Sequence, residues 1–250
     1  MRAVVDALAS VGAFSRFCVR GVRVLPRMDR RETLDVAASM AFGTLLVTLA
    51  VTAFAGAMLT VQGFASLKAF GTPELLGMFI SLAGVREVFP LIAAGCIGAK
   101  LGSALAAEVA TLRTGQQLDA LEVMGIEPLE HLLMPRMTAA TLVTPLLAGL
   151  GVLCGLGASG VIATLQLGVD PGAFWARALD SIHPRDIAAG LTKALAFGAL
   201  TGSLGCWHGY TAGSGPWAVG RAANLTVVQL MVVGALVNLL LSHLFYGGLL

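Results

Sequence analysis

Two ionisable side chains, Arg86 and Glu87, stand next to each other inside an otherwise apolar stretch of the sequence. Ionisable groups at membrane depth are costly, so they usually pair with one another or face a cavity. Two roles are therefore open for this pair: a structural ion pair near a membrane surface, or part of a pocket for a substrate with a polar head. Lys193 is a further cation among apolar residues, and no sequence pattern accounts for it.

Nucleophilic chemistry has only a weak signal. Residues 157–160 read GASG, which matches the GxSG pattern of intramembrane serine proteases with Ser159 as the nucleophile. His183, His208 and His243 are the candidate bases, but none lies in a supporting motif. A chain rich in Gly, Ala and Ser produces such a tetrapeptide easily, so proteolysis is the weakest of the alternatives.

The elements that must position these side chains are membrane-spanning helices. Of the 250 residues, 57% are hydrophobic and 12% are charged, and the mean hydropathy is +0.85. A bilayer solvates apolar side chains but requires every backbone polar group to be paired internally, which helices achieve. A net charge of +2 offers no basic groove for nucleic acid. The composition predicts an all-α integral membrane protein that binds no nucleic acid.

Five apolar segments exceed the roughly 20 residues that a spanning helix needs. Four contain uninterrupted runs without Lys, Arg, Asp or Glu, at residues 36–67, 137–169, 194–220 and 222–250. The remaining one, residues 75–107, is interrupted by Arg86, Glu87 and Lys100. Together they form one membrane domain over residues 31–250. We place the spans at about residues 36–67, 75–107, 131–167, 186–210 and 219–247.

Residues 1–30 have the pattern of an amphipathic helix that lies in the membrane interface. Apolar residues from Val11 to Leu25 recur at steps of three and four, and arginines from Arg16 to Arg27 follow another face at the same steps. Seven of the sixteen Lys and Arg residues precede Val36, which predicts a cytoplasmic N-terminus. Five crossings then predict a C-terminus on the periplasmic side.

A polar segment between the second and third spans, residues 111–128, is expected on the cytoplasmic side. Leu121 and Met124 fall on one helical face, whereas Asp119 and Glu122 lie around the other, and Pro128 is expected to end the helix. Connections in helical bundles commonly have about 2 to 8 residues, so this one is long for a solvated loop. The segment is therefore predicted to be a short helix that docks on a cytoplasmic partner.

The sequence also contains a long ordered motif. It runs from Gly84 to Arg136 and includes the Arg86-Glu87 pair, DALEVMG at residues 119–125, and Pro135-Arg136. It resembles the signature region of the MlaE/YrbE permeases, the membrane subunits of ABC systems that move lipids together with MCE proteins. The resemblance extends over about residues 34–245 and is far more specific than a tetrapeptide.

The resemblance implies a permease subunit of an ATP-driven lipid transporter in the bacterial cytoplasmic (inner) membrane. The system would move phospholipid or a similar lipid between this membrane and the outer envelope. The expected partners are a second copy of the chain, a cytoplasmic ABC ATPase dimer and an MCE-domain hexamer on the periplasmic side. The sequence contains no GxxxxGK[ST] motif, so ATP and Mg are expected on the ATPase. This chain is expected to bind no metal or cofactor and to catalyse no reaction.

The resemblance also implies roles for individual residues. Residues 111–128 correspond to the coupling helix, and two positions depart from the family pattern: Phe89 where Gly is more common, and Lys100 in place of a common Arg. Both departures are expected to affect the volume of the lipid pocket or its headgroup preference. The lipid-binding positions carried over are Leu59, Gln62, Leu67, Phe70, Arg86 and Glu87. The ATPase-coupling positions are Arg113, Gln117, Asp119, Leu121, Glu122, Met124 and Glu127.

One alternative requires no ATPase. A secondary transporter or channel would need an ion pathway through the charged residues of the spans. These are Arg86, Glu87, Lys100 and Lys193.

Overall fold

The protein forms a bundle of five membrane-length helices. The structure, a computed structural model, describes residues 2–28 and 30–247, and the side chains of these except residues 2–8 and 27. The described residues are almost entirely helical and contain five helices that are long and apolar enough to span a membrane, as the composition predicts. The spans are Arg30–Ala69, Pro73–Thr114, Leu129–Gln166, Pro184–Tyr210 and Pro216–Tyr246.

Two of the spans are built from several helical pieces. The first, fourth and fifth spans are the single helices α2 (Arg30–Ala69), α8 (Pro184–Tyr210) and α9 (Pro216–Tyr246). The second consists of a 3₁₀ turn (Pro73–Leu75), α3 (Leu76–Phe79), the π-helix η3 (Ile80–Val88) and α4 (Phe89–Thr114). The third consists of the π-helix η4 (Leu129–Leu133), α6 (Met134–Val161) and the π-helix η5 (Ile162–Gln166).

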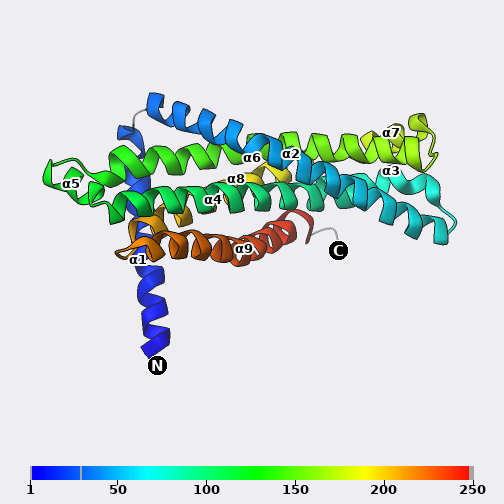
Figure 1. Cartoon of the computed structure of the whole chain (residues 1–250). Helices are drawn as coiled ribbons and strands as arrows, with labels where there is room; N and C mark the ends of the chain where they lie inside the picture. The colour runs from blue at the N-terminus through cyan, green and yellow to red at the C-terminus, as the bar shows by residue number, and fades with distance from the viewer. Residues whose placement is uncertain (1, 29, 248–250) are drawn as a thin grey trace.

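The N-terminal helix α1 (Arg2–Val24) lies outside this bundle. Figure 1 shows it running across the long axis of the bundle, at the end that carries α5 (Gln117–Val123). A 3₁₀ turn at Leu25–Arg27, which contains Pro26, separates it from α2. A helix lying in a membrane surface has this orientation relative to spanning helices.

Small residues allow α2 and α6 to pack closely. Thr48 and Thr52 of α2 are buried, and each hydroxyl donates to the carbonyl four residues earlier. A Cβ atom on Gly56 would collide with the carbonyl of Gly155. The glycines of these helices therefore serve close backbone approach, as small residues do between membrane helices.

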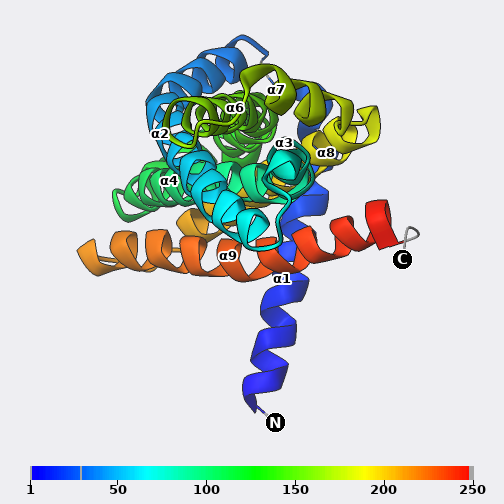
Figure 2. The same ribbon diagram turned by 90° about the vertical axis from the view of Figure 1, so that its right-hand side faces the viewer.

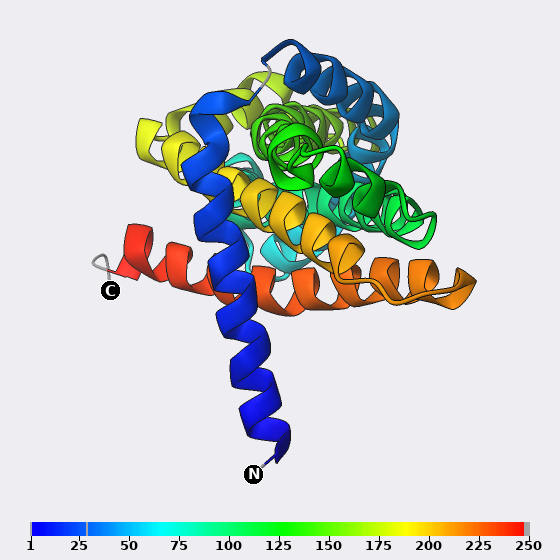
Figure 3. The same ribbon diagram turned by 90° about the vertical axis from the view of Figure 1, so that its left-hand side faces the viewer.

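The last span, α9, lies obliquely across one side of the bundle, against α4 and α8. The two end-on views, Figures 2 and 3, show it crossing the view, whereas the helices of the central bundle recede along it. It buries only a few of its residues and exposes a broad apolar face that includes Met231, Leu236 and Leu240. This face is suited to lipid or to another apolar helix.

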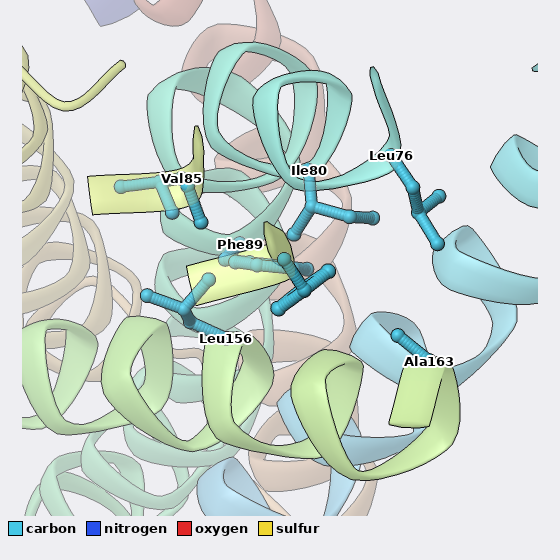
Figure 4. Close-up of a cluster of buried hydrophobic side chains, with 8 residues drawn as sticks. Leu76, Ile80, Val85, Phe89, Leu156 and Ala163 are labelled. Atoms are coloured by element: carbon cyan, nitrogen blue, oxygen red, sulfur yellow. The ribbon is translucent and has the colours of Figure 1, made fainter. Parts of the chain in front are cut away.

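The end of the bundle opposite α5 is closed by α3 and the short helix α7 (Pro171–Asp180) (Figure 1). The Ser81 hydroxyl donates to the Ala178 carbonyl at 2.7 Å, which ties η3 to α7. Buried apolar side chains of the second and third spans pack together in the interior at this end of the bundle (Figure 4). Those labelled in Figure 4 are Leu76, Ile80, Val85, Phe89, Leu156 and Ala163.

Phe89 has a defined place in this cluster. Its side chain is fully buried. A Cβ atom on Gly84 would lie 2.7 Å from the ring atom Cζ, and one on Gly155 would lie 3.2 Å from Cδ1. The ring thus occupies space that two glycines leave open, so the large side chain at this position is accommodated in the core.

Candidate functional site

Arg86 and Glu87 pair with α8 and not with each other. Arg86 Nε lies 2.9 Å from Asp186 Oδ1, and its Nη2 lies 3.3 Å from Oδ2. Lys193 Nζ lies 2.8 Å from Glu87 Oε1. We call these four residues the charged cluster. Its two ion pairs hold the second span against the fourth and give Lys193 the partner that no sequence pattern indicated.

Local helix geometry makes this double pairing possible. Asp186 and Lys193 are seven residues apart on α8, so they lie on the same face two turns apart. Arg86 and Glu87 are consecutive but belong to η3, a π-helix with a wider turn than an α-helix. π-helical segments are rare and are frequent at functional sites.

The end of α9 completes the cluster. Ser242 Oγ donates to Glu87 Oε2 at 3.0 Å, and the Tyr246 hydroxyl donates to Asp186 Oδ1 at 3.1 Å. The Tyr246 ring also lies over the Arg86 guanidinium, with 4.5 Å between Cζ and the ring centroid. Three spans therefore meet at these side chains, and the charges compensate one another in a region where an unpaired charge is expensive.

The two sides of each ion pair differ in exposure. The α8 partners are enclosed, with 6% of the Asp186 side chain and 2% of the Lys193 side chain exposed. The η3 partners are accessible, with 25% of Arg86 and 34% of Glu87 exposed. A polar ligand can therefore reach Arg86 and Glu87 but not the buried ends of the pairs.

An almost wholly apolar groove leads to the cluster. Its volume is about 670 Å³, and it lies between α6 and α8, with Leu150 and Leu153 on one wall and Leu191 on the other. Val85 and the enclosed Asp186 also line it, so the groove reaches the charged cluster at Asp186, whereas Arg86 and Glu87 lie outside its lining. The apolar walls suit an acyl chain, and the accessible charges of the cluster lie beside the groove rather than in it.

The other predicted lipid-binding residues lie on α2 or just after it. Leu59 and Leu67 are half-buried and pack against the core cluster that contains Phe89. Gln62 and Phe70 are exposed, Phe70 to 82%. The structure thus brings Leu59 and Leu67 to the apolar side of η3 and leaves Gln62 and Phe70 on the surface.

Lys100 is separate from the charged cluster. Its Nζ donates to the backbone carbonyl of Gly43 on α2. This bond links α4 to α2, and among the described residues no ion pair joins Lys100 to the charged cluster.

At the opposite end, α5 is anchored by a residue that the sequence pattern did not single out. Leu118 is fully buried and belongs to a cluster with Val109, Leu133 and Cys206. Its spacing of three from Leu121 was a signal that could have revealed it. The expectation that this helix runs to Pro128 is wrong, because α5 ends at Val123 and Gly125 turns the chain with a φ of +77°.

Most predicted coupling residues lie on the surface around this anchor. Arg113 pairs with Asp119 at 2.5 Å, and its guanidinium lies over the Tyr210 ring, 5.7 Å from the centroid. Val123, which the sequence pattern did not single out either, is 89% exposed. The other exposed coupling residues are Gln117, Glu122, Met124 and Glu127, whereas Leu121 is half-buried.

Ser159 does not have the surroundings of a nucleophile. Its side chain is fully buried, and its hydroxyl donates to the carbonyls of Gly155 at 2.8 Å and Gly56 at 3.1 Å. His183 lies beside the Ser181 carbonyl, and His208 lies beside Gln229. Ser159 is thus a packing residue between α2 and α6.

The bundle has five membrane-length spans, a charged cluster in which each charge is compensated, and a polar helical segment at the opposite end. These features are those of a multi-span membrane transport subunit, a permease. The model of the family described as Permease MlaE matches residues 33–244. The chain belongs to this family.

Named relatives agree with this assignment. A probable ABC transporter permease protein of Synechocystis is 31% identical over 89% of this chain and 84% of its own length. A probable ABC transporter permease protein of Rickettsia felis is 29% identical over 95% of this chain and 92% of its own. The intermembrane phospholipid transport system permease protein MlaE of Haemophilus influenzae is 29% identical over 82% of this chain and 79% of its own.

Proposed function

We propose that this chain is the membrane permease of an ABC lipid transporter that moves phospholipid or a similar lipid between the bacterial cytoplasmic membrane and the outer envelope. The observation that carries the proposal is the family match, which includes all four residues of the charged cluster and the α5 segment. The name of the Haemophilus influenzae relative supports phospholipid as the cargo.

The geometry suits a role in lipid binding. Apolar walls accept acyl chains at about 0.8 kcal/mol for each buried CH₂ group. Asp186 at the groove is bonded to the more accessible Arg86, which a headgroup could contact. In this proposal Leu59, Gln62, Leu67 and Phe70 belong to the same lipid path. A headgroup that competes for Arg86 or Glu87 would loosen the contacts among the second, fourth and fifth spans.

The proposed assembly contains two copies of the chain, a cytoplasmic ATPase dimer that carries ATP and Mg, and an MCE-domain hexamer on the periplasmic side. The N-terminus and α5 would face the cytoplasm, and the C-terminus would face the periplasm. The exposed Val123, the last residue of α5, and Met124, which follows it, suit insertion into a groove of the ATPase. Nucleotide could drive movement of the spans only if those contacts differ between the two ATPase states.

Affinity purification of the full chain from its own membrane tests the proposal. We expect a P-loop ATPase to purify with it, and mass spectrometry to find phospholipid in the assembled complex. Charge reversal at Asp119 and Glu122 should uncouple ATP hydrolysis from lipid movement. Purification without any ATPase, together with full transport by the Asp119 and Glu122 variants, would instead support a secondary transporter.

A further inference from the structure

A second cavity lies at the α5 end of the bundle, far from the charged cluster. Its volume is about 710 Å³. Its walls come from α1, from the end of α5 and the chain that follows it through η4, and from the last turn of α8. Because α1 crosses the bundle at this end (Figure 1), an α1 that lies in the membrane surface would bring the cavity to the depth of the lipid headgroups.

The cavity has positive charge on one wall and negative charge on another. Arg16 and Arg20, one helical turn apart on α1, line the first wall, and Glu122 and Glu127 line the second. No ion pair joins the two walls among the described side chains. The only hydrogen bond of the Glu122 carboxylate in the described structure is a long one, 3.4 Å, from the Tyr210 hydroxyl. The cavity thus holds separated charges that a ligand could bridge.

Aromatic side chains also line the cavity. The Phe17 ring lies 5.3 Å from that of Trp207 and 6.1 Å from that of Tyr210, measured between centroids. All three residues line the cavity. Trp and Tyr are enriched at the depth of lipid headgroups, where one side of the ring is apolar and the other is wet.

We propose that this cavity binds the headgroup of an amine-bearing zwitterionic phospholipid from the adjacent leaflet. Two guanidinium groups present N–H donors to the lipid phosphate, and arginine is well suited to bind phosphate in this way. The ammonium group then lies towards Glu122 and Glu127. A headgroup with no ammonium would leave both carboxylates facing its phosphate without compensation, so the two-sided charge favours a zwitterion over an anionic lipid.

This site goes beyond the proposed transport function. A lipid held here would join α1 to the α5 segment at the end opposite the charged cluster, as a resident part of the structure. Its binding can be measured without nucleotide, ATPase or lipid movement. Failure of the transport proposal would therefore leave this measurement unaffected.

The test is native mass spectrometry of the full-length chain in detergent, titrated with phosphatidylethanolamine or phosphatidylglycerol. We expect the wild-type chain to retain phosphatidylethanolamine at least about tenfold more tightly, the factor that corresponds to roughly 1.4 kcal/mol. Arg16→Gln with Arg20→Gln should weaken the binding of both lipids, because both carry the phosphate that the arginines contact. Glu122→Gln with Glu127→Gln should weaken the binding of phosphatidylethanolamine and strengthen the binding of phosphatidylglycerol.

A matched control is Arg23→Gln with Arg30→Gln, which removes two exposed arginines near the same end that do not line the cavity. This control should bind both lipids as the wild-type chain does. Any lipid bound at the charged cluster contributes equally to all variants, because none of them changes that cluster. Ala13→Trp fills the cavity without changing charge and should expel the lipid. The proposal is overturned if the wild-type chain retains both lipids equally, or if the control loses as much lipid binding as the Arg16 and Arg20 variant. It is also overturned if Ala13→Trp still binds phosphatidylethanolamine, or if a segment of a protein partner occupies the cavity.

Discussion

Lys193 of α8 and Glu87 of η3 form an ion pair at 2.8 Å inside the helical bundle, with only 2% of the lysine side chain exposed. The lysine cannot extend its ammonium group to water, so its charge depends on Glu87. Glu87 in turn accepts a hydrogen bond from Ser242 of α9. A single carboxylate thus links three spans, and it is also the most accessible member of the charged cluster.

Reversing this carboxylate should stop lipid passage. Glu87→Lys places a second cation beside the buried Lys193, and loss of one partner of a buried pair costs about 3–5 kcal/mol. We expect lipid transport by the reconstituted complex to fall to background. The double variant Glu87→Lys with Lys193→Glu restores opposite charges and should recover part of the transport. Wild-type transport by Glu87→Lys alone would remove Glu87 from the lipid site.

The control for Glu87→Lys is the same charge reversal at Glu74, which forms an exposed ion pair with Arg177. Glu74 is 77% exposed, so Glu74→Lys should cost at most about 1 kcal/mol. Thermal unfolding of both variants in detergent separates loss of folding from loss of transport.

The Phe89 ring should contribute strongly to stability. Phe89→Ala removes a fully buried ring between Gly84 and Gly155 and should lower the free energy of unfolding by about 3–5 kcal/mol. Phe42→Ala, at a ring that is 80% exposed, should change it little. Denaturant unfolding in detergent gives both values, and equal losses would show that Phe89 is not a core residue.

Close packing of α2 on α6 should make Gly56 intolerant of a larger side chain. Gly56→Ala directs a methyl group at the Gly155 carbonyl and should destabilise the protein by about 1–3 kcal/mol. Gly149→Ala, with open space around the new Cβ, is the matched control and should cause no loss. Melting temperatures of the two variants test this, and an unchanged value for Gly56→Ala would contradict the observed packing.

The apolar tip of α5 should carry ATPase binding. Val123→Asp and Met124→Asp change side chains that are 89% and 65% exposed, so folding should persist while the ATPase no longer purifies with the chain. Leu179→Asp, on exposed α7 at the other end, should leave ATPase binding intact. Undiminished purification of the ATPase with both α5 variants would place coupling elsewhere.

Much of the fold could be predicted from local sequence. The five spans follow from long apolar runs, and the N-terminal helix follows from the separate faces of Val11 and Arg16. The extent of α5 was predicted less well, because Pro128 looked like the terminator while Gly125 ends the segment through a positive φ that its sequence context does not reveal.

The charged cluster could be predicted only in part. Arg86 and Glu87 were visible because they interrupt an apolar run. Asp186 was inconspicuous because it follows Pro184 at the start of a helix, where acidic residues are common. Ser242 and Tyr246 are polar residues four apart in an apolar span, and this spacing was an available signal.

The sequence by itself determined that this protein is a set of spanning helices, since in lipid the backbone polar groups of each apolar run must be satisfied within that run. Only the tertiary structure decided which charges meet. Arg86 pairs with a residue 100 positions away and Glu87 with one 106 positions away. Such pairs depend on how η3, α8 and α9 pack against one another, and that packing arises from contacts spread over the whole bundle.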